Sequence, residues 1–75
     1  MIDEIKLEAK MVLRIQYFKC RDGWSASIVE FPNKTVLNTF KSFAARQIKV
    51  LALKQIAEEI EHGNTAVVPD SVTFI

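Results

Sequence analysis

Few side chains in this sequence have the chemistry of an active site, and those few do not form a pair. Cys20 is the single cysteine and His62 the single histidine of the 75 residues. A zinc cage takes about four ligands, which one cysteine and one histidine cannot supply. We therefore interpret Cys20 as an ordinary thiol at the end of a strand. We interpret His62 as a helix-end residue whose imidazole interacts favourably with the helix dipole.

Carboxylates gather at Glu58, Glu59 and Glu61, near the end of a predicted helix. Their spacing lacks the histidine or further carboxylate that would hold a metal ion, so we interpret them as a solvated acidic helix end. Gly23 and Gly63 are explained by turns and form no phosphate-binding loop. Because no two groups offer an acid with a base, or a nucleophile with its activator, the sequence predicts no enzyme, no cofactor and no bound metal.

Basic side chains form a more informative pattern. The first half of the predicted helix contains Lys41, Arg46 and Lys49. Lys34 lies in the turn that precedes the third predicted strand. Cations at a helix N-terminus oppose the helix dipole, but with the free N–H groups there they attract phosphate or carboxylate. We therefore predict that these four residues bind a partner. Two alternatives stay open: the long side chains extend past an apolar arc, or the basic end meets the acidic end of an antiparallel helix in a symmetric dimer.

Three strands are predicted before the helix. Residues 11–20 alternate between apolar and polar types, as in a half-buried strand. Asp22-Gly23 predicts a tight hairpin turn, because both central positions tolerate positive φ. The second strand begins at Trp24 and stops at Pro32, where Pro32-Asn33 supplies the next turn. The third strand covers residues 35–40, which are rich in β-branched and aromatic types.

A long helix is predicted over residues 42–62, with Ser42 or Thr39 as its N-cap and Gly63 as its C-terminal stop. Its apolar residues occupy an arc of about 200°, wider than one sheet contact needs. They are Ile48, Ala52, Ala45, Ile56, Ile60, Leu53, Ala57 and Val50. Two explanations remain open: the helix sinks deeply into a concave sheet, or the flank of the arc packs on another subunit.

A short strand over residues 71–75 completes the predicted order β-β-β-α-β. The predicted fold is α+β, with one long helix on one face of a three- to four-stranded antiparallel sheet. We treat residues 1–10 as an N-terminal extension and residues 11–75 as a single domain. Four residues are expected to anchor the core or an interface. They are Tyr17 and Trp24 across the first hairpin, and Val50 and Leu53 on the helix.

Composition narrows the setting in which such a domain works. A chain this short buries only about 60% of its unfolded surface, and Cys20 has no partner for a disulfide, so we expect a homo-oligomer, either a dimer or a tetramer. The unpaired cysteine favours a reducing compartment, so we expect a cytoplasmic protein. No apolar run reaches the length that spans a membrane. A net charge of +1 gives no strong overall attraction to nucleic acid or to an anionic membrane.

A series of short motifs comes before the third predicted strand, the long helix and Gly63. The motifs are Asp22-Gly23-Trp24, Ala26 and Glu30-Phe31-Pro32. In this series residues 11–75 resemble the N-terminal domain of HicB-type antitoxins and their stand-alone relatives. The resemblance implies a partly degraded ribonuclease-H-like fold, oligomerisation through sheet and helix, and binding of a small toxin or related protein without catalysis. Because the sequence ends at Ile75, without room for the DNA-binding domain of full antitoxins, we expect no direct operator binding.

A second resemblance is to double-stranded RNA-binding domains. It is carried by Ser42 and Arg46 at the opening of a helix that follows three strands, where that family contacts phosphates through basic side chains. The sequence thus predicts a non-enzymatic regulatory module that binds an unidentified protein. The alternative prediction is RNA binding through Lys34, Lys41, Arg46 and Lys49.

Overall fold

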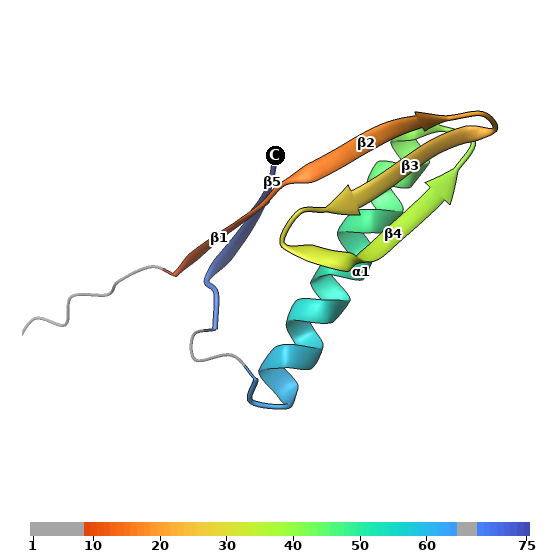
Figure 1. Cartoon of the computed structure of the whole chain (residues 1–75). Helices are drawn as coiled ribbons and strands as arrows, with labels where there is room; N and C mark the ends of the chain where they lie inside the picture. The colour runs from red at the N-terminus through yellow and green to blue at the C-terminus, as the bar shows by residue number, and fades with distance from the viewer. Residues whose placement is uncertain (1–8, 65–67) are drawn as a thin grey trace, which may run out of the picture.

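The computed structural model describes residues 9–64 and 68–75, which form an α+β fold. The elements are β1 (Lys10–Leu13), β2 (Ile15–Cys20), β3 (Gly23–Ile28), β4 (Phe31–Asn38), α1 (Lys41–Glu61) and β5 (Ser71–Phe74) (Figure 1). The predicted fold class and the β-β-β-α-β layout are confirmed, with α1 packed on β3 and β4. Of the predicted N-terminal extension, residues 1–8 lie outside the described residues.

The first hairpin joins β2 to β3 in the antiparallel sheet β2-β3-β4. Cys20 pairs with Gly23, so the linking residues are Arg21 and Asp22, and the turn predicted at Asp22-Gly23 is one residue too late. A turn centred on Asp22-Gly23 would need positive φ at Asp22, and no described residue other than glycine has positive φ. Gly23 instead begins β3 with a φ of 153°.

The second hairpin also turns earlier than predicted. Ile28 pairs with Phe31, so the turn is at residues 29–30 and the prediction of a turn at Pro32-Asn33 is wrong. The register then shifts, because Ser27 pairs with Thr35, and residues 32–34 form a bulge inside β4. Proline lacks an N–H group and is tolerated where a strand is bulged or lies at a sheet edge. As a result β4 covers Phe31–Asn38, where residues 35–40 were predicted.

The predicted strand over residues 11–20 is divided at Arg14 into β1 and β2. The final strand forms as predicted, but β5 pairs in parallel with β1 and not antiparallel within the main sheet. Ile15 N–H donates to the Ile75 carbonyl at 2.8 Å, and Ile75 N–H donates to the Leu13 carbonyl at 2.9 Å. These bonds attach β5 to the β1–β2 junction.

The ends of α1 differ in how well the sequence predicts them. The helix begins at Lys41 with Phe40 as N-cap and no side-chain cap, so the prediction of Ser42 or Thr39 is wrong. The Gly63 stop is confirmed, with φ at 68°. Gly63 N–H donates to the Ile60 carbonyl at 3.2 Å, and Asn64 N–H donates to the Glu59 carbonyl at 2.8 Å. This pair of bonds satisfies carbonyls that the helix end would leave free.

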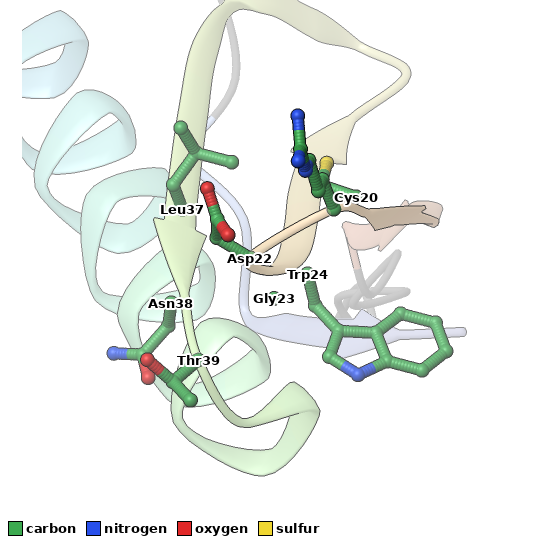
Figure 2. Close-up of a pocket in the computed structure, with 8 residues that line it drawn as sticks. Cys20, Asp22, Gly23, Trp24, Leu37, Asn38 and Thr39 are labelled. Carbon is green, nitrogen blue, oxygen red and sulfur yellow. The ribbon is translucent and has the colours of Figure 1, made fainter.

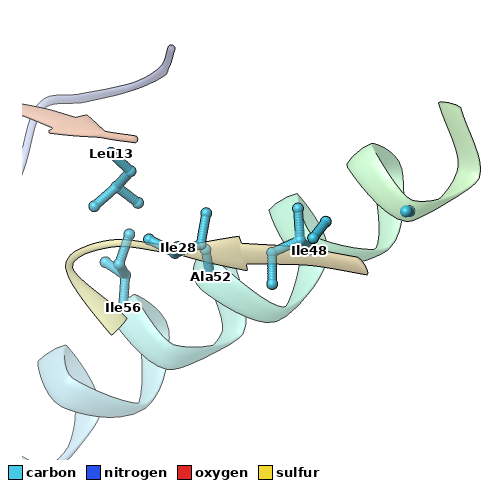
Figure 3. Close-up of a cluster of buried hydrophobic side chains, with 7 residues drawn as sticks. Leu13, Ile28, Ile48, Ala52 and Ile56 are labelled. Carbon is cyan, nitrogen blue, oxygen red and sulfur yellow. The ribbon is translucent and has the colours of Figure 1, made fainter. Parts of the chain in front are cut away.

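The core lies between α1 and the sheet (Figure 3). It consists of Ala44, Ile48, Ala52 and Ile56 on the helix with Leu13, Ala26 and Ile28 on the strands. Within the predicted apolar arc, Val50, Leu53, Ala57 and Ile60 are exposed. The explanation that the helix sinks deeply into the sheet is therefore wrong, and the flank of the arc has no cover within the described chain.

An ion pair fastens the β1–β2 junction to the turn between β3 and β4. Arg14 donates from its backbone N–H to Glu30 Oε1 at 2.7 Å and from Nε to Oε2 at 2.9 Å. The backbone N–H of Arg14 is the main cause that holds the pKa of Glu30 below its ordinary value, and the guanidinium adds to it. The ionised form of Glu30 therefore favours the folded chain.

We expect Glu30→Gln to lower the free energy of unfolding at neutral pH, because glutamine is not an anionic acceptor. A lowered pKa in the fold means that the stabilisation is complete above the unfolded pKa, ordinarily 4.5, and is lost as pH falls through the folded pKa. Urea denaturation is expected to show a gap between wild type and variant at about pH 7 that shrinks by about pH 3. An equal gap at both pH values would contradict this prediction.

Candidate functional site

A groove runs between β4 and the neighbouring flank of α1. It has a volume of about 510 Å³ and is lined by Val36, Leu37, Arg46, Gln47, Val50 and Leu51. Leu37 is 71% exposed and Val50 45% exposed, although both are large apolar side chains. We call this feature the β4–α1 groove. Its lining offers apolar contact with one cation and one amide at the rim.

The strand that forms one wall of the groove is at the edge of the sheet. In the order β2-β3-β4, one long side of β4 has no strand partner among the described residues. Val29 N–H donates to the Arg14 carbonyl at 2.9 Å. This bond shows which residues of β3 direct their backbone N–H and C=O groups toward β2. Because the direction of backbone groups alternates along a strand, the N–H and C=O of Val36 point to β3, and those of Thr35 and Leu37 point outward.

The two halves of β4 differ in how their edge is protected. The first half carries Pro32 and the bulge over residues 32–34, which are features that block pairing with another strand. The second half, residues 35–38, has neither proline nor charge. Outward backbone groups on an uncharged, β-branched segment are suited to pair with an added strand.

Aromatic side chains stand at the end of the groove where α1 begins. Phe40 and Phe43 meet edge to face with 5.7 Å between ring centroids, and the Arg46 guanidinium lies 5.8 Å from the Phe43 ring centroid. Phe40 is 60% exposed. The groove therefore continues into an exposed aromatic surface.

Two of the predicted anchors contact lysines near the turn of the first hairpin. Tyr17 and Trp24 are half-buried and pack against the core. Lys41 Nζ lies 4.7 Å from the Tyr17 ring centroid and 5.1 Å from that of Trp24, and Lys19 Nζ lies 5.0 Å from Trp24. Cations over aromatic faces are attracted to the ring quadrupole. Lys41 thus packs on the sheet and does not line the groove.

The other predicted basic residues lie elsewhere. Lys49 Nζ is 5.7 Å from the Phe74 ring centroid on β5, and Lys34 lines a separate pocket of about 180 Å³ with Glu30 and Glu59. Arg46 alone of the four lines the β4–α1 groove. The structure therefore places Arg46 and Val50 together in the lining of the groove, which Lys34, Lys41 and Lys49 do not line. Leu53 is 47% exposed and does not line the groove.

Sequence reasoning missed the strand wall of the groove. Val36, Leu37 and Gln47 were not among the predicted site residues, because the order of strands in the sheet is not written in any local pattern. The available signal was Leu37 itself, an apolar residue that directly follows the apolar Val36 in the predicted strand. That alternation places Val36 and Leu37 on opposite faces of a strand, and α1 covers only one face.

A second hollow of about 420 Å³ lies at the tip of the first hairpin, lined by Cys20, Asp22, Gly23, Trp24 and their neighbours. Figure 2 shows the side chains of Cys20, Trp24 and Asn38 pointing in different directions. The Cys20 thiol contacts the Phe18 carbonyl at 3.7 Å. Within residues 9–64 and 68–75, no group of three or more His, Cys, Asp or Glu is arranged to hold a metal ion.

Comparison with protein-family models, curated proteins and solved structures finds no match to this chain. No helix in the described part of the chain combines the length and the apolar character that crossing a membrane requires.

Proposed function

We propose that this chain is a non-enzymatic regulatory module of the cytoplasm that binds protein through the β4–α1 groove and assembles into a homo-oligomer. The observation that carries the proposal is the outward edge of β4 beside an apolar groove. Proteins that recognise an extended segment commonly add it as a strand to such an edge. Main-chain hydrogen bonds then supply affinity, and the neighbouring groove supplies specificity.

Each part of the groove has a role in this proposal. Thr35 and Leu37 offer outward N–H and C=O groups to the added strand. Val50 and Leu51 offer apolar contact to the side chains that point toward the helix. Arg46 at the rim suits a carboxylate, which a guanidinium binds with charge-assisted hydrogen bonds.

The exposure of large apolar side chains supports binding to another protein chain over a monomer that has no partner. Leu37 and Val50 in the lining of the groove are each exposed by more than two fifths, and so is Phe40 where α1 begins. Exposed apolar surface gathered in one place marks an interaction site in soluble proteins. Covering it on association removes apolar area from water, which stabilises the complex.

The resemblance to HicB-type antitoxins supports the same proposal. It rests on Asp22-Gly23-Trp24 and Glu30-Phe31-Pro32, and that family binds small toxin proteins without catalysis. The proposal accordingly extends to a small toxin-like protein as the partner. RNA binding is the less favoured alternative, because Lys41 and Lys49 are placed over aromatic rings, Lys34 lines a separate pocket, and Arg46 alone of the four lines the groove.

A pull-down from the native host, with and without nuclease, tests protein binding at the groove. Three baits are compared: wild type, Leu37→Glu in the groove, and Phe18→Glu. Phe18 is a matched control, because it is 57% exposed and shares a cross-strand row with Leu37 through Ser25, yet lies outside the groove. We expect one stoichiometric protein with wild type and with Phe18→Glu, and its recovery to fall about tenfold or more with Leu37→Glu.

Three results would count against this proposal. Equal capture by all three baits would remove the groove from the binding site. Recovery that collapses with nuclease would move RNA binding ahead of protein binding. Capture of nothing by the wild-type bait would leave no support for a partner in that host.

A further inference from the structure

We infer that a second copy of this chain occupies the β4–α1 groove, joined by antiparallel pairing of the two β4 edges about a two-fold axis beside Thr35. This inference rests on the proposed function, and it names the occupant of the same site. The two sheets would form one continuous sheet, with both α1 helices on the same face. The evidence comes from the edge, from the level of the helix beside it, and from the charges along α1.

The edge of β4 can pair with itself. The N–H and C=O of Thr35 point outward, so two Thr35 residues related by a two-fold axis exchange both hydrogen bonds, as in any hydrogen-bonded antiparallel pair. A two-fold interface uses the same patch on both chains. About this axis residues 36–38 face residues 34–32 of the second copy, where the bulge and Pro32 interrupt pairing, so the main-chain hydrogen bonds are confined to the residues around Thr35.

The hollows beside β4 show which part of α1 lies level with Thr35. Val36 and Leu37 lie beside the helix segment that runs from Arg46 to Leu51. Residues 31–34 lie beside Gln55 and Glu59. Thr35 therefore lies level with the helix between Leu51 and Gln55. A two-fold axis at that level sets the two helices antiparallel and side by side, which brings the exposed flank of each to the other.

Charge along α1 selects a second copy as the occupant. The segment from Lys41 to Lys54 contains four cations and no carboxylate, whereas Glu58, Glu59 and Glu61 follow without a cation. The first turn has no acidic residue and the last turn no basic one, which is unfavourable to the dipole of a solitary helix. Antiparallel helices centred between Leu51 and Gln55 bring Arg46 of each copy beside the Glu58 to Glu61 turn of the other. An unrelated extended segment would leave this division of charge without a counterpart.

Proline substitution tests the edge. Thr35→Pro removes an outward donor without removing a bond to β3, and Lys19→Pro does the same on the opposite edge of the sheet, where Lys19 is exposed. Sedimentation equilibrium of the purified chains is expected to give a dimer for wild type and Lys19→Pro. The dimer dissociation constant of Thr35→Pro is expected to rise at least about tenfold. Circular dichroism checks that each variant is folded.

Charge reversal tests the helix arrangement independently of proline. Two variants are made. Arg46→Glu places carboxylates beside carboxylates in its own homodimer. The double variant Glu58→Lys with Glu61→Lys places cations beside Arg46 in its own homodimer. Each is expected to dimerise at least about tenfold more weakly than wild type, most clearly at low salt. Mixing the two variants restores opposite charges at both contacts, so a heterodimer of near wild-type affinity is expected.

The outcomes separate this inference from the proposed function. A wild-type chain that stays monomeric up to about 1 mM overturns the dimer, while capture of another protein by the pull-down stands apart from it. A dimer that survives Thr35→Pro overturns pairing through β4. Variants that are weakened singly but not restored by mixing overturn the antiparallel helices.

Discussion

Gly23→Ala is expected to lower the free energy of unfolding by about 3 kcal/mol or more, through two independent effects. A Cβ at Gly23 would meet the backbone carbonyl oxygen of Asn38 and would lie 2.9 Å from Thr39 Cα. The φ of 153° is, in addition, a conformation that residues with a side chain rarely adopt. The neighbours are main-chain atoms of the β4–α1 connection, so relief requires that the connection to α1 moves.

Gly63→Ala is the matched control for this prediction. Gly63 has a φ of 68°, but nothing lies within 4 Å of a Cβ built there, so only the conformational cost of about 1 kcal/mol applies. Urea denaturation of wild type and both variants measures the difference. Equal destabilisation by the two substitutions would show that close approach between β3 and the end of β4 has no energetic effect.

Ile48→Ala is expected to destabilise the fold by about 2–5 kcal/mol. Ile48 is fully buried at the centre of the helix row that packs on β3. Alanine removes apolar contact and leaves a cavity that helix and sheet cannot close without moving. Domains are stable by only about 5–15 kcal/mol, so this one change removes a large share of the total.

Leu53→Ala, on the same helix, is the control for the buried position. Leu53 is 47% exposed, so its substitution is expected to cost about 1 kcal/mol or less in the monomer. Both variants are compared with wild type by urea denaturation at a protein concentration low enough to exclude association. A smaller loss for Ile48→Ala than for Leu53→Ala would mean that the core is centred elsewhere.

Local patterns in the sequence predicted the elements well where a single residue type decides the conformation. Gly63 ends α1 because its positive φ suits glycine. The predicted apolar arc included the buried Ile48, Ala52 and Ile56, but it also included four residues that are exposed. Pro32 misled the prediction, since a proline read as a turn is accommodated here in a bulge of an edge strand. The N-cap was missed because Phe40, which has no capping side chain, occupies that position.

Long-range pairing could not be predicted from such patterns. Nothing local in residues 10–13 or 71–74 states that β1 and β5 run parallel to each other. The edge position of β4 depends equally on strand order, so Leu37 was not recognised as part of a site. The basic residues were recognised, but helical spacing alone does not reveal that Lys41 packs on Tyr17 and Trp24 while Lys49 packs on Phe74.

The pairing of β1 with β5 has a consequence for the order of folding. The two hairpins and α1 follow one another along the chain, so β2, β3, β4 and α1 meet through short loops at little entropic cost. Closing β1 onto β5 spans nearly the whole described chain, and contacts of such long separation form slowly.

During synthesis β1 leaves the ribosome first among these elements, and its partner strand follows last. The nascent chain therefore holds an unpaired β1 beside an already collapsed sheet and helix until β5 is made. Loss of β5 from the finished fold would reverse that last step and expose Leu13, the core residue nearest to it, without unfolding the sheet.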